Sequence, residues 1–75
     1  MLKEGSIKVH DSIFHYLLKV NNEPSQFGID GGKVDKLMIE CNGDTVCDYY
    51  RGWEIEPTDA DTQTALELLL HSHNY

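Results

Sequence analysis

The sequence predicts an α+β domain: an antiparallel sheet of about four strands with one C-terminal helix packed on one face. Three observations predict it. Apolar and polar residues alternate over much of the first two thirds of the chain, turn-forming residues separate these stretches, and a helical apolar pattern appears only near the end. A chain of 75 residues is expected to form a single domain, residues 1–75.

The first expected hairpin joins residues 6–10 to residues 13–21 through a turn at His10-Asp11-Ser12. Side chains alternate along a strand, so one face of the second strand is expected to enter the core. That face carries Phe14, Tyr16, Leu18 and Val20. The opposite face is unusually apolar for a solvated surface, which makes it a candidate oligomer interface. Its candidate residues are Ile13, His15 and Leu17.

The middle of the chain predicts a glycine-rich turn followed by a second hairpin. Pro24 ends the preceding strand because it cannot donate to a ladder. Residues 27–29 are then expected to be a short extended piece, and residues 30–32 of the segment GIDGGK a tight turn. Residues 33–41 then form a strand with Leu37, Ile39 and Cys41 directed inward. The Asn-Gly pair in CNGDTV predicts a tight turn, because these residues readily adopt the primed turns that match strand twist.

The length of this loop decides what the two cysteines can do. A two-residue loop, either Asn42-Gly43 or Gly43-Asp44, places Cys41 and Cys47 on opposite faces, where they cannot bridge. A three-residue loop over residues 43–45 places them directly opposite, at roughly disulfide distance. Reduced thiols are the expectation for so few cysteines.

The stretch DYYRGWEIEP allows two interpretations. In the first, a strand begins at Thr45 or Val46 and continues toward Ile55 past a bulge at Gly52. Trp53 or Tyr49 then covers the apolar stripe of the helix. Alternatively, Tyr50 and Arg51, with Trp53, form a recognition patch, because Tyr, Trp and Arg are frequent interface anchors.

The final helix is predicted from TDADTQTALELLLHSH. Thr58 is the expected N-cap, and Asp59 and Asp61 lie favourably at the positive end of the helix dipole. The apolar stripe that should face the sheet comprises Ala65, Leu66, Leu69 and Leu70.

The negative charge is concentrated in the second half of the chain. Five acids and five bases balance up to Lys36, whereas eight acids face only Arg51 afterwards, so the net charge of −7 arises there. These acids are Glu40, Asp44, Asp48, Glu54, Glu56, Asp59, Asp61 and Glu67. Direct nucleic-acid binding is not expected, because phosphate neutralisation needs clustered Lys and Arg. A basic protein partner fits this charge.

No motif in the chain specifies a reaction, a metal or a cofactor. GIDGGK lacks the spacing of a phosphate loop and leads into a strand, and His71 and His73 point about 200° apart on a helix. We therefore expect no catalytic residues, no metal ligands and no cofactor. No apolar run approaches the ~20 residues that span a bilayer, and the N-terminus lacks the apolar core of a signal peptide, so no membrane contact and a cytoplasmic location are expected.

Two segments resemble a known family. NEPSQFGIDGGKVDKLMI and YYRGWEIEPTDADTQTALELLL are similar to a family of short, uncharacterised bacterial proteins with an R-G-W-[DE]-[IV]-x-P motif before a final helix, often found in phage and mobile elements. This resemblance implies a genetic context and transfers no catalytic residue. By analogy, it places the chain beside small acidic inhibitors such as anti-CRISPR proteins.

The leading hypothesis is a non-enzymatic interaction module, encoded by a phage or mobile element, that docks on a basic protein surface. Where that surface belongs to a host nucleic-acid-binding machine of the CRISPR type, the module would compete with phosphates and inhibit it. The candidate partner-binding residues are Tyr50, Arg51, Glu54, Glu56, Asp59 and Asp61. The alternative is a homo-oligomeric structural or accessory protein, for instance a homodimer, using the face of Ile13, His15 and Leu17. A metal-dependent or hydrolytic enzyme is a third interpretation.

Overall fold

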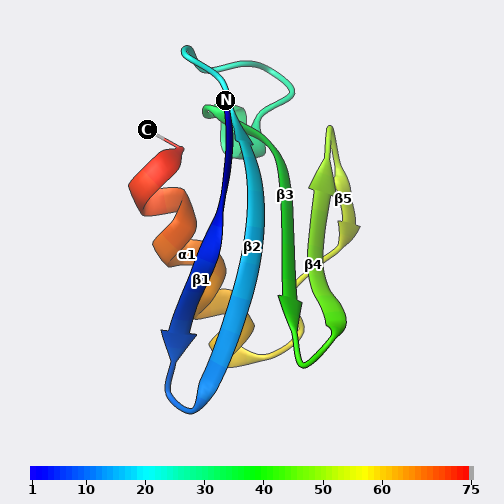
Figure 1. The fold of residues 1–75 in the computed structure, drawn as a ribbon. Helices are drawn as coiled ribbons and strands as arrows, with labels where there is room; N and C mark the ends of the chain where they lie inside the picture. The colour runs from blue at the N-terminus through cyan, green and yellow to red at the C-terminus, as the bar shows by residue number, and fades with distance from the viewer. Residues whose placement is uncertain (75) are drawn as a thin grey trace.

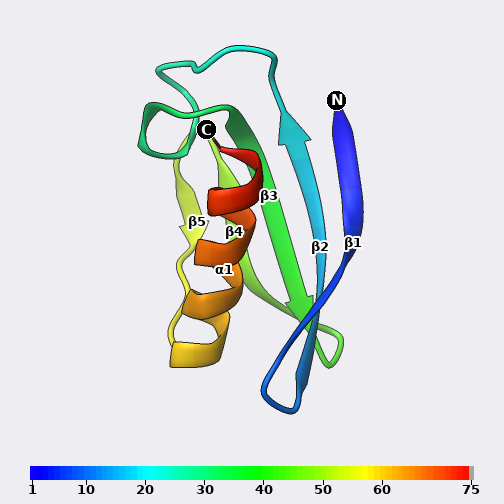
Figure 2. The ribbon, with the colours of Figure 1, turned by 90° about the vertical axis from the view of Figure 1, so that its left-hand side faces the viewer.

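The chain folds as one antiparallel sheet with a single helix on one face, so the predicted α+β class is confirmed (Figure 1). The computed structural model describes residues 1–74. Five strands lie side by side in chain order, β1 (Leu2–Val9), β2 (Ser12–Val20), β3 (Val34–Cys41), β4 (Asp44–Tyr50) and β5 (Trp53–Ile55). The helix α1 (Ala60–His73) lies against one face of this meander, as the turned view shows (Figure 2).

The sheet has five strands where about four were predicted, because the chain reverses after β4. Arg51 adopts a left-handed conformation with φ of 57°, and the Tyr50 amide donates to the Gly52 carbonyl at 3.0 Å. Trp53 therefore returns beside Tyr49 in a short antiparallel strand. The interpretation of Gly52 as a bulge within one long strand is wrong, and a tight turn lies there instead.

The β3–β4 hairpin has the two-residue Asn42-Gly43 loop, with φ of 54° and 83° at the two positions. Its register shifts after Ile39, so Ile39 lies opposite Cys47. This irregularity changes the side-chain parity of β4. Cys47 is buried, and Cys41 packs against the same core, so the expected placement on opposite faces is wrong. Both thiols are free, as expected.

The core lies between the sheet and α1. The second strand contributes Phe14 and Leu18 to it, fully buried as predicted, with Tyr16 and Val20 packed at its margin. The inward residues of β3 and the stripe of α1 meet them. These are Leu37, Ile39, Ala65, Leu66 and Leu69.

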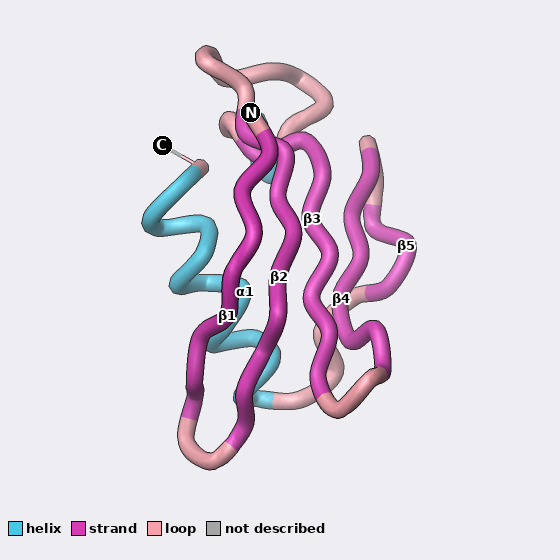
Figure 3. The backbone as a smooth tube through the Cα atoms, viewed as in Figure 1, coloured by secondary structure: helices cyan, strands magenta, loops and turns pink. Residues whose placement is uncertain are grey.

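The long connection between β2 and β3 folds back over one end of the sheet (Figure 3). It contains a single 3-10 turn, η1 (Ile29–Gly31), which buries Ile29. Residues 27–29 were expected to be extended, with the turn at residues 30–32. The helical turn instead begins at Ile29, with Asp30 in a left-handed conformation at φ 53°.

Asn74 joins this connection to the end of α1. Its fully buried side chain accepts a hydrogen bond from the Val34 amide at 2.9 Å and donates to the Ile29 carbonyl at 2.8 Å. Its backbone carbonyl accepts from the Lys33 amide at 3.0 Å. One asparagine therefore fixes both η1 and the start of β3 against the helix end.

Candidate functional site

A groove of about 460 Å³ lies between α1, β5 and η1. Segments far apart in the sequence form it, and they come together because β5 folds back toward the helix while η1 is fixed to the helix end by Asn74. The groove is lined by Ile29, Asp30, Trp53, Glu56, Pro57, Gln63, Leu66, Glu67, Leu70 and His71.

The floor of the groove is apolar and rigidly supported. Ile29 and Leu66 are almost completely buried, and Trp53 remains 37% exposed beside them. The indole packs edge to face on the Tyr49 ring, with centroids 5.0 Å apart and planes at 72°. The Tyr49 hydroxyl donates to the Phe27 carbonyl at 2.9 Å, which holds the supporting ring in place. An aromatic wall held this way can accept a ligand at little cost in side-chain entropy.

The lining of the groove is acidic. Asp30, Glu56 and Glu67 bring a carboxylate each from η1, the segment after β5 and the helix. The Gln63 amide donates to a Glu67 carboxylate oxygen at 3.2 Å and so orients it. The described lining contains no Lys or Arg to neutralise these charges, and His71 is its one basic side chain. Acidic groups around an apolar floor are complementary to a cationic side chain with a long aliphatic stem.

Of the predicted partner-binding acids, only Glu56 lines this groove. Asp59 is instead the N-cap of α1, where its carboxylate accepts from the Thr62 amide at 3.1 Å and the Thr62 hydroxyl at 2.6 Å. Thr58 was the expected cap, and this was wrong because the Asp59 side chain is the one that reaches the amide of the third helical residue. These hydrogen bonds hold the pKa of Asp59 below its ordinary value of 3.8.

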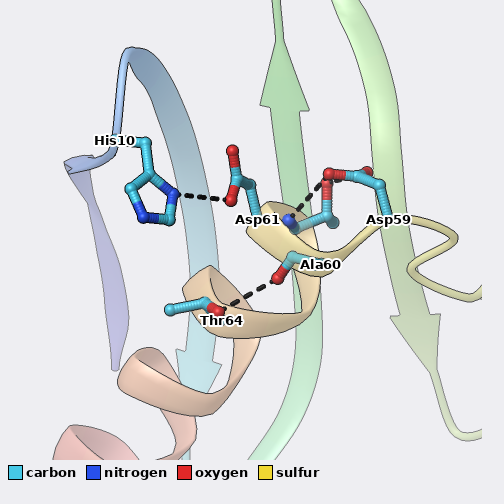
Figure 4. A network of polar contacts seen from close by, with 6 residues as sticks. His10, Asp59, Ala60, Asp61 and Thr64 are labelled. Carbon is cyan, nitrogen blue, oxygen red and sulfur yellow. Dashed lines mark hydrogen bonds and ion pairs between the residues drawn. The ribbon is translucent and has the colours of Figure 1, made fainter.

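Asp61 is also engaged within the fold. Figure 4 shows His10, from the β1–β2 turn, directed at Asp61 beside the Asp59 cap. The His10 Nδ1 atom lies 2.8 Å from a carboxylate oxygen of Asp61, which ties the turn to the start of the helix. Asp59 and Asp61 thus hold parts of the fold together, whereas Asp30, Glu56 and Glu67 line the open groove.

Tyr50 and Arg51 lie in a separate aromatic cluster at the β4–β5 turn. The Arg51 guanidinium lies 4.6 Å from the centroid of the Phe27 ring and 5.9 Å from that of Tyr50. Tyr50 is 55% exposed, and Lys36 approaches its ring at 5.9 Å. Glu54 is exposed on β5. The six predicted residues therefore occupy three places: the groove, the helix start and this turn with its adjoining strand.

The predicted oligomer residues lie on the sheet face that α1 leaves open. Ile13 is 52% exposed, and Leu17 is half-buried opposite Met38 of β3. His15 lies opposite Glu40, and these side chains border a shallow hollow of about 160 Å³. This face carries apolar residues as the sequence predicted.

We next considered metal ligands, reactive thiols and membrane-spanning helices among the described residues. Residues 1–74 contain no group of three or more His, Cys, Asp or Glu side chains placed to hold a metal ion. Burial in the core, with the neighbouring Asp48 charge, raises the pKa of the Cys47 thiol to about 12. Such a thiol stays protonated at neutral pH and is a poor nucleophile. No helix within these residues has the length and apolarity to cross a bilayer.

Sequence reasoning missed the groove, although it singled out several of its residues. One interpretation of Trp53 was that it covers the helix stripe, and Asp30 and Gln63 carry no recognisable signal. The one available clue was the only tryptophan next to acids just before a helix.

The fold and groove together define a small α+β meander domain with an acidic, aromatic-walled cleft. The chain belongs to the family described as "Domain of unknown function (DUF7678)", whose pattern it matches over residues 1–74. Comparison with curated proteins and with solved structures found no match.

Proposed function

We propose that this protein is a non-enzymatic interaction module that binds a basic segment of a partner protein in the groove between α1, β5 and η1. The observation that supports it is the groove lining itself. Three carboxylates and the partly exposed Trp53 wall surround an apolar floor, and no Lys or Arg among the lining residues neutralises the carboxylates.

A Lys or Arg side chain satisfies both parts of this surface. Its methylene stem packs on Leu66 and Leu70, while its charged end lies near Glu56 or Glu67. A guanidinium over the Trp53 ring adds a cation–π contribution. The other exposed acids of the second half, including Glu54, steer a cationic partner toward the molecule without contacting it.

The kind of partner follows from this chemistry. A basic surface that ordinarily holds DNA or RNA offers closely spaced Lys and Arg side chains, and an acidic module would compete with the phosphates for them. This is the basis for the proposed role as a phage or mobile-element inhibitor of a host nucleic-acid-binding machine of the CRISPR type. A protein recovered from a host lysate should therefore lose affinity for nucleic acid in the presence of this module.

Tryptophan fluorescence tests the groove directly, because Trp53 is the only tryptophan of the chain. The probe is an eight-residue peptide of alternating arginine and leucine, titrated at low salt. We expect saturable quenching or a spectral shift that is lost at high salt. A peptide with glutamate in place of arginine should leave the emission unchanged.

Matched acid variants locate the binding site. Glu56→Gln removes a groove carboxylate and should weaken binding by up to about five-fold, since an exposed ion pair contributes roughly 0.2–1 kcal/mol. Glu54→Gln removes an equal charge two residues away, outside the groove lining, and should have a smaller effect. Equal losses in both variants, or binding without any change in Trp53 emission, would argue against the groove.

A second candidate function is the homo-oligomeric structural or accessory role. The open sheet face favours it, because Ile13 is 52% exposed and Leu17 and Met38 are adjacent on that face. Leu17→Glu would place a charge at its centre. A sedimentation coefficient that falls to the monomer value in this variant supports the role, and a wild-type protein that is monomeric throughout contradicts it.

A further inference from the structure

The free edge of β1 has an unusual combination of length, regularity and exposure. β1 spans eight residues, pairs only with β2, and keeps an unbroken register along that strand. The opposite edge of the sheet, β5, has three residues and is far shorter. Long regular edges are templates for pairing with another strand, whereas short ones are protected.

The hydrogen-bond parity of β1 identifies the backbone groups that face this edge. Met1 and Val20 exchange both of their backbone hydrogen bonds, at 2.9 and 2.8 Å. In an antiparallel ladder such pairs alternate, so Lys3, Gly5 and Ile7 also direct their amides and carbonyls toward β2. The backbone groups of Glu4, Ser6 and Lys8 therefore point away from the sheet.

Only some registers of a second strand satisfy these outward groups. Two antiparallel β1 strands would be related by a two-fold axis. Backbone hydrogen bonds form between them only in registers that place outward-facing residues of one copy opposite outward-facing residues of the other. With the axis at Ser6, Glu4 of one copy lies opposite Lys8 of the other, and this ion pair occurs twice. About six backbone hydrogen bonds would then join the strands. Shifting the axis to Gly5 or Ile7 loses the Glu4–Lys8 match.

The side chains of β1 are compatible with the register in which Glu4 lies opposite Lys8 of the second copy. Glu4 and Lys8 are both exposed, and neither forms an ion pair within residues 1–74. Gly5 has no side chain to obstruct the second copy, and the Tyr16 ring covers it, since a Cβ there would lie 2.8 Å from the Tyr16 hydroxyl. An aromatic residue over a glycine on the neighbouring strand stabilises an edge strand.

We propose that two copies of this protein pair along their β1 edges, with Glu4 opposite Lys8 of the second copy, to form one continuous ten-stranded sheet. This interface differs from the sheet face of Ile13, His15 and Leu17, and it goes beyond the proposed groove function. None of the groove-lining residues comes from β1. The dimer would therefore carry two open grooves and bind a partner with two basic segments through both.

Amide hydrogen exchange measured by NMR at two protein concentrations tests the proposal. We expect the amides of Glu4, Ser6 and Lys8 to exchange quickly in dilute monomer and slowly in a concentrated sample, after correction for intrinsic rates. The amides of Lys3, Gly5 and Ile7 should be protected in both. A protein that sediments as a monomer up to about 0.5 mM, or a dimer whose Glu4, Ser6 and Lys8 amides stay unprotected, would overturn the proposal.

A charge exchange tests the register. Glu4→Lys replaces two attractive pairs by two repulsive ones, so the dimer should weaken roughly tenfold or more. The double variant Glu4→Lys with Lys8→Glu restores opposite charges and should recover the wild-type dissociation constant. Equal losses in the single and double variants would exclude this register. Circular dichroism and the melting temperature verify that each variant folds.

Met38→Lys separates this interface from the open sheet face. Met38 lies opposite Leu17 on that face but belongs to β3, two strands from the β1 edge, so this variant should leave the edge dimer within about two-fold of wild type. Loss of the dimer in Met38→Lys, with retention in Glu4→Lys, would assign self-association to the sheet face and reject the β1 edge.

Discussion

Asn74 shows how one side chain can organise two segments at once. The Val34 amide and the Ile29 carbonyl are buried where water cannot reach them, and the Asn74 amide group supplies the acceptor and the donor they need. Gly32 makes room for it, because a Cβ at that position would lie 2.3 Å from the Asn74 side chain. A buried polar group is costly when it lacks a partner, so this residue stabilises the fold mainly by preventing two such costs.

Replacing Asn74 tests this role. Asn74→Ala leaves the Val34 amide and the Ile29 carbonyl unpartnered, and each such group costs about 1–3 kcal/mol. We expect the free energy of unfolding in urea to fall by about 2–4 kcal/mol. Asn22→Ala, at an exposed asparagine, should stay within about 0.5 kcal/mol of wild type. Similar midpoints for the two variants would show that Asn74 is not a structural clamp.

The lowered pKa of Asp59 predicts how acid affects the helix cap. Because the folded state holds the carboxylate ionised below its ordinary pKa of 3.8, its contribution to stability is complete above that pH and disappears as the pH falls through the folded value. Asp59→Asn keeps a cap but cannot titrate. The difference in free energy of unfolding between wild type and Asp59→Asn should thus be constant above about pH 5 and change steadily below pH 4.

Urea titrations at several pH values between about 6 and 2 measure this difference. Asp44→Asn removes an exposed carboxylate at the β3–β4 turn and controls for the loss of one negative charge. A wild-type to Asp59→Asn difference that is independent of pH over the whole range would contradict the assignment of the cap.

At the scale of elements, local signals predicted the hairpins and the helix, and backbone irregularities accounted for most of the errors. Alternation placed Phe14 and Leu18 in the core, and the Asn42-Gly43 pair forms the tight turn that its sequence predicts. The register shift at Ile39 and the left-handed Arg51 had no clear sequence signal, because arginine seldom adopts positive φ. The register shift places Cys47 opposite Ile39, and the turn at Arg51 allows β5 to pair with β4.

The β3–β4 turn gives a prediction with a closely matched control. Gly43 has φ of 83°, where a side chain is strained although its surroundings are empty. Gly43→Ala should lower the free energy of unfolding by about 1 kcal/mol. A Cβ at Gly52 also meets open space, and its φ lies outside the left-handed region, so Gly52→Ala should be neutral or stabilise by up to about 1 kcal/mol. Chemical denaturation measures the free energy of unfolding of both variants. Equal changes in Gly43→Ala and Gly52→Ala would rule out a requirement for left-handed backbone at Gly43.

At the scale of the whole molecule, the groove lay beyond prediction because its walls come from three distant segments. Asp30, Trp53 and Glu67 share no local pattern, and only the fold-back of β5 and the anchoring of η1 bring them together. The concentration of negative charge, in contrast, was evident in the sequence. Its acids are distributed over the groove, the helix start, the hairpin tip and the open sheet face, so electrostatic repulsion acts across the entire domain.

This repulsion predicts that salt stabilises the fold. The molecule measures 34 × 20 × 18 Å along its principal axes and carries a net charge of −7. At about 10 mM ionic strength the screening length is about 30 Å and its carboxylates interact across the whole domain, whereas at about 100 mM it shortens to about 10 Å. We therefore expect the melting temperature to rise by a few degrees over this range, since a change of about 1 kcal/mol shifts it by about 4–8 °C in a domain of this size.

Calorimetry or circular dichroism at the two salt concentrations measures the shift. A double variant, Glu40→Gln with Glu54→Gln, removes two exposed charges and should melt higher than wild type at low salt while responding less to added salt. The His10–Asp61 contact is an ion pair that salt weakens only when the imidazole carries a proton, and it is one exposed contact against a net charge of −7. A melting temperature that falls as salt is added would mean that favourable ion pairs outweigh this repulsion.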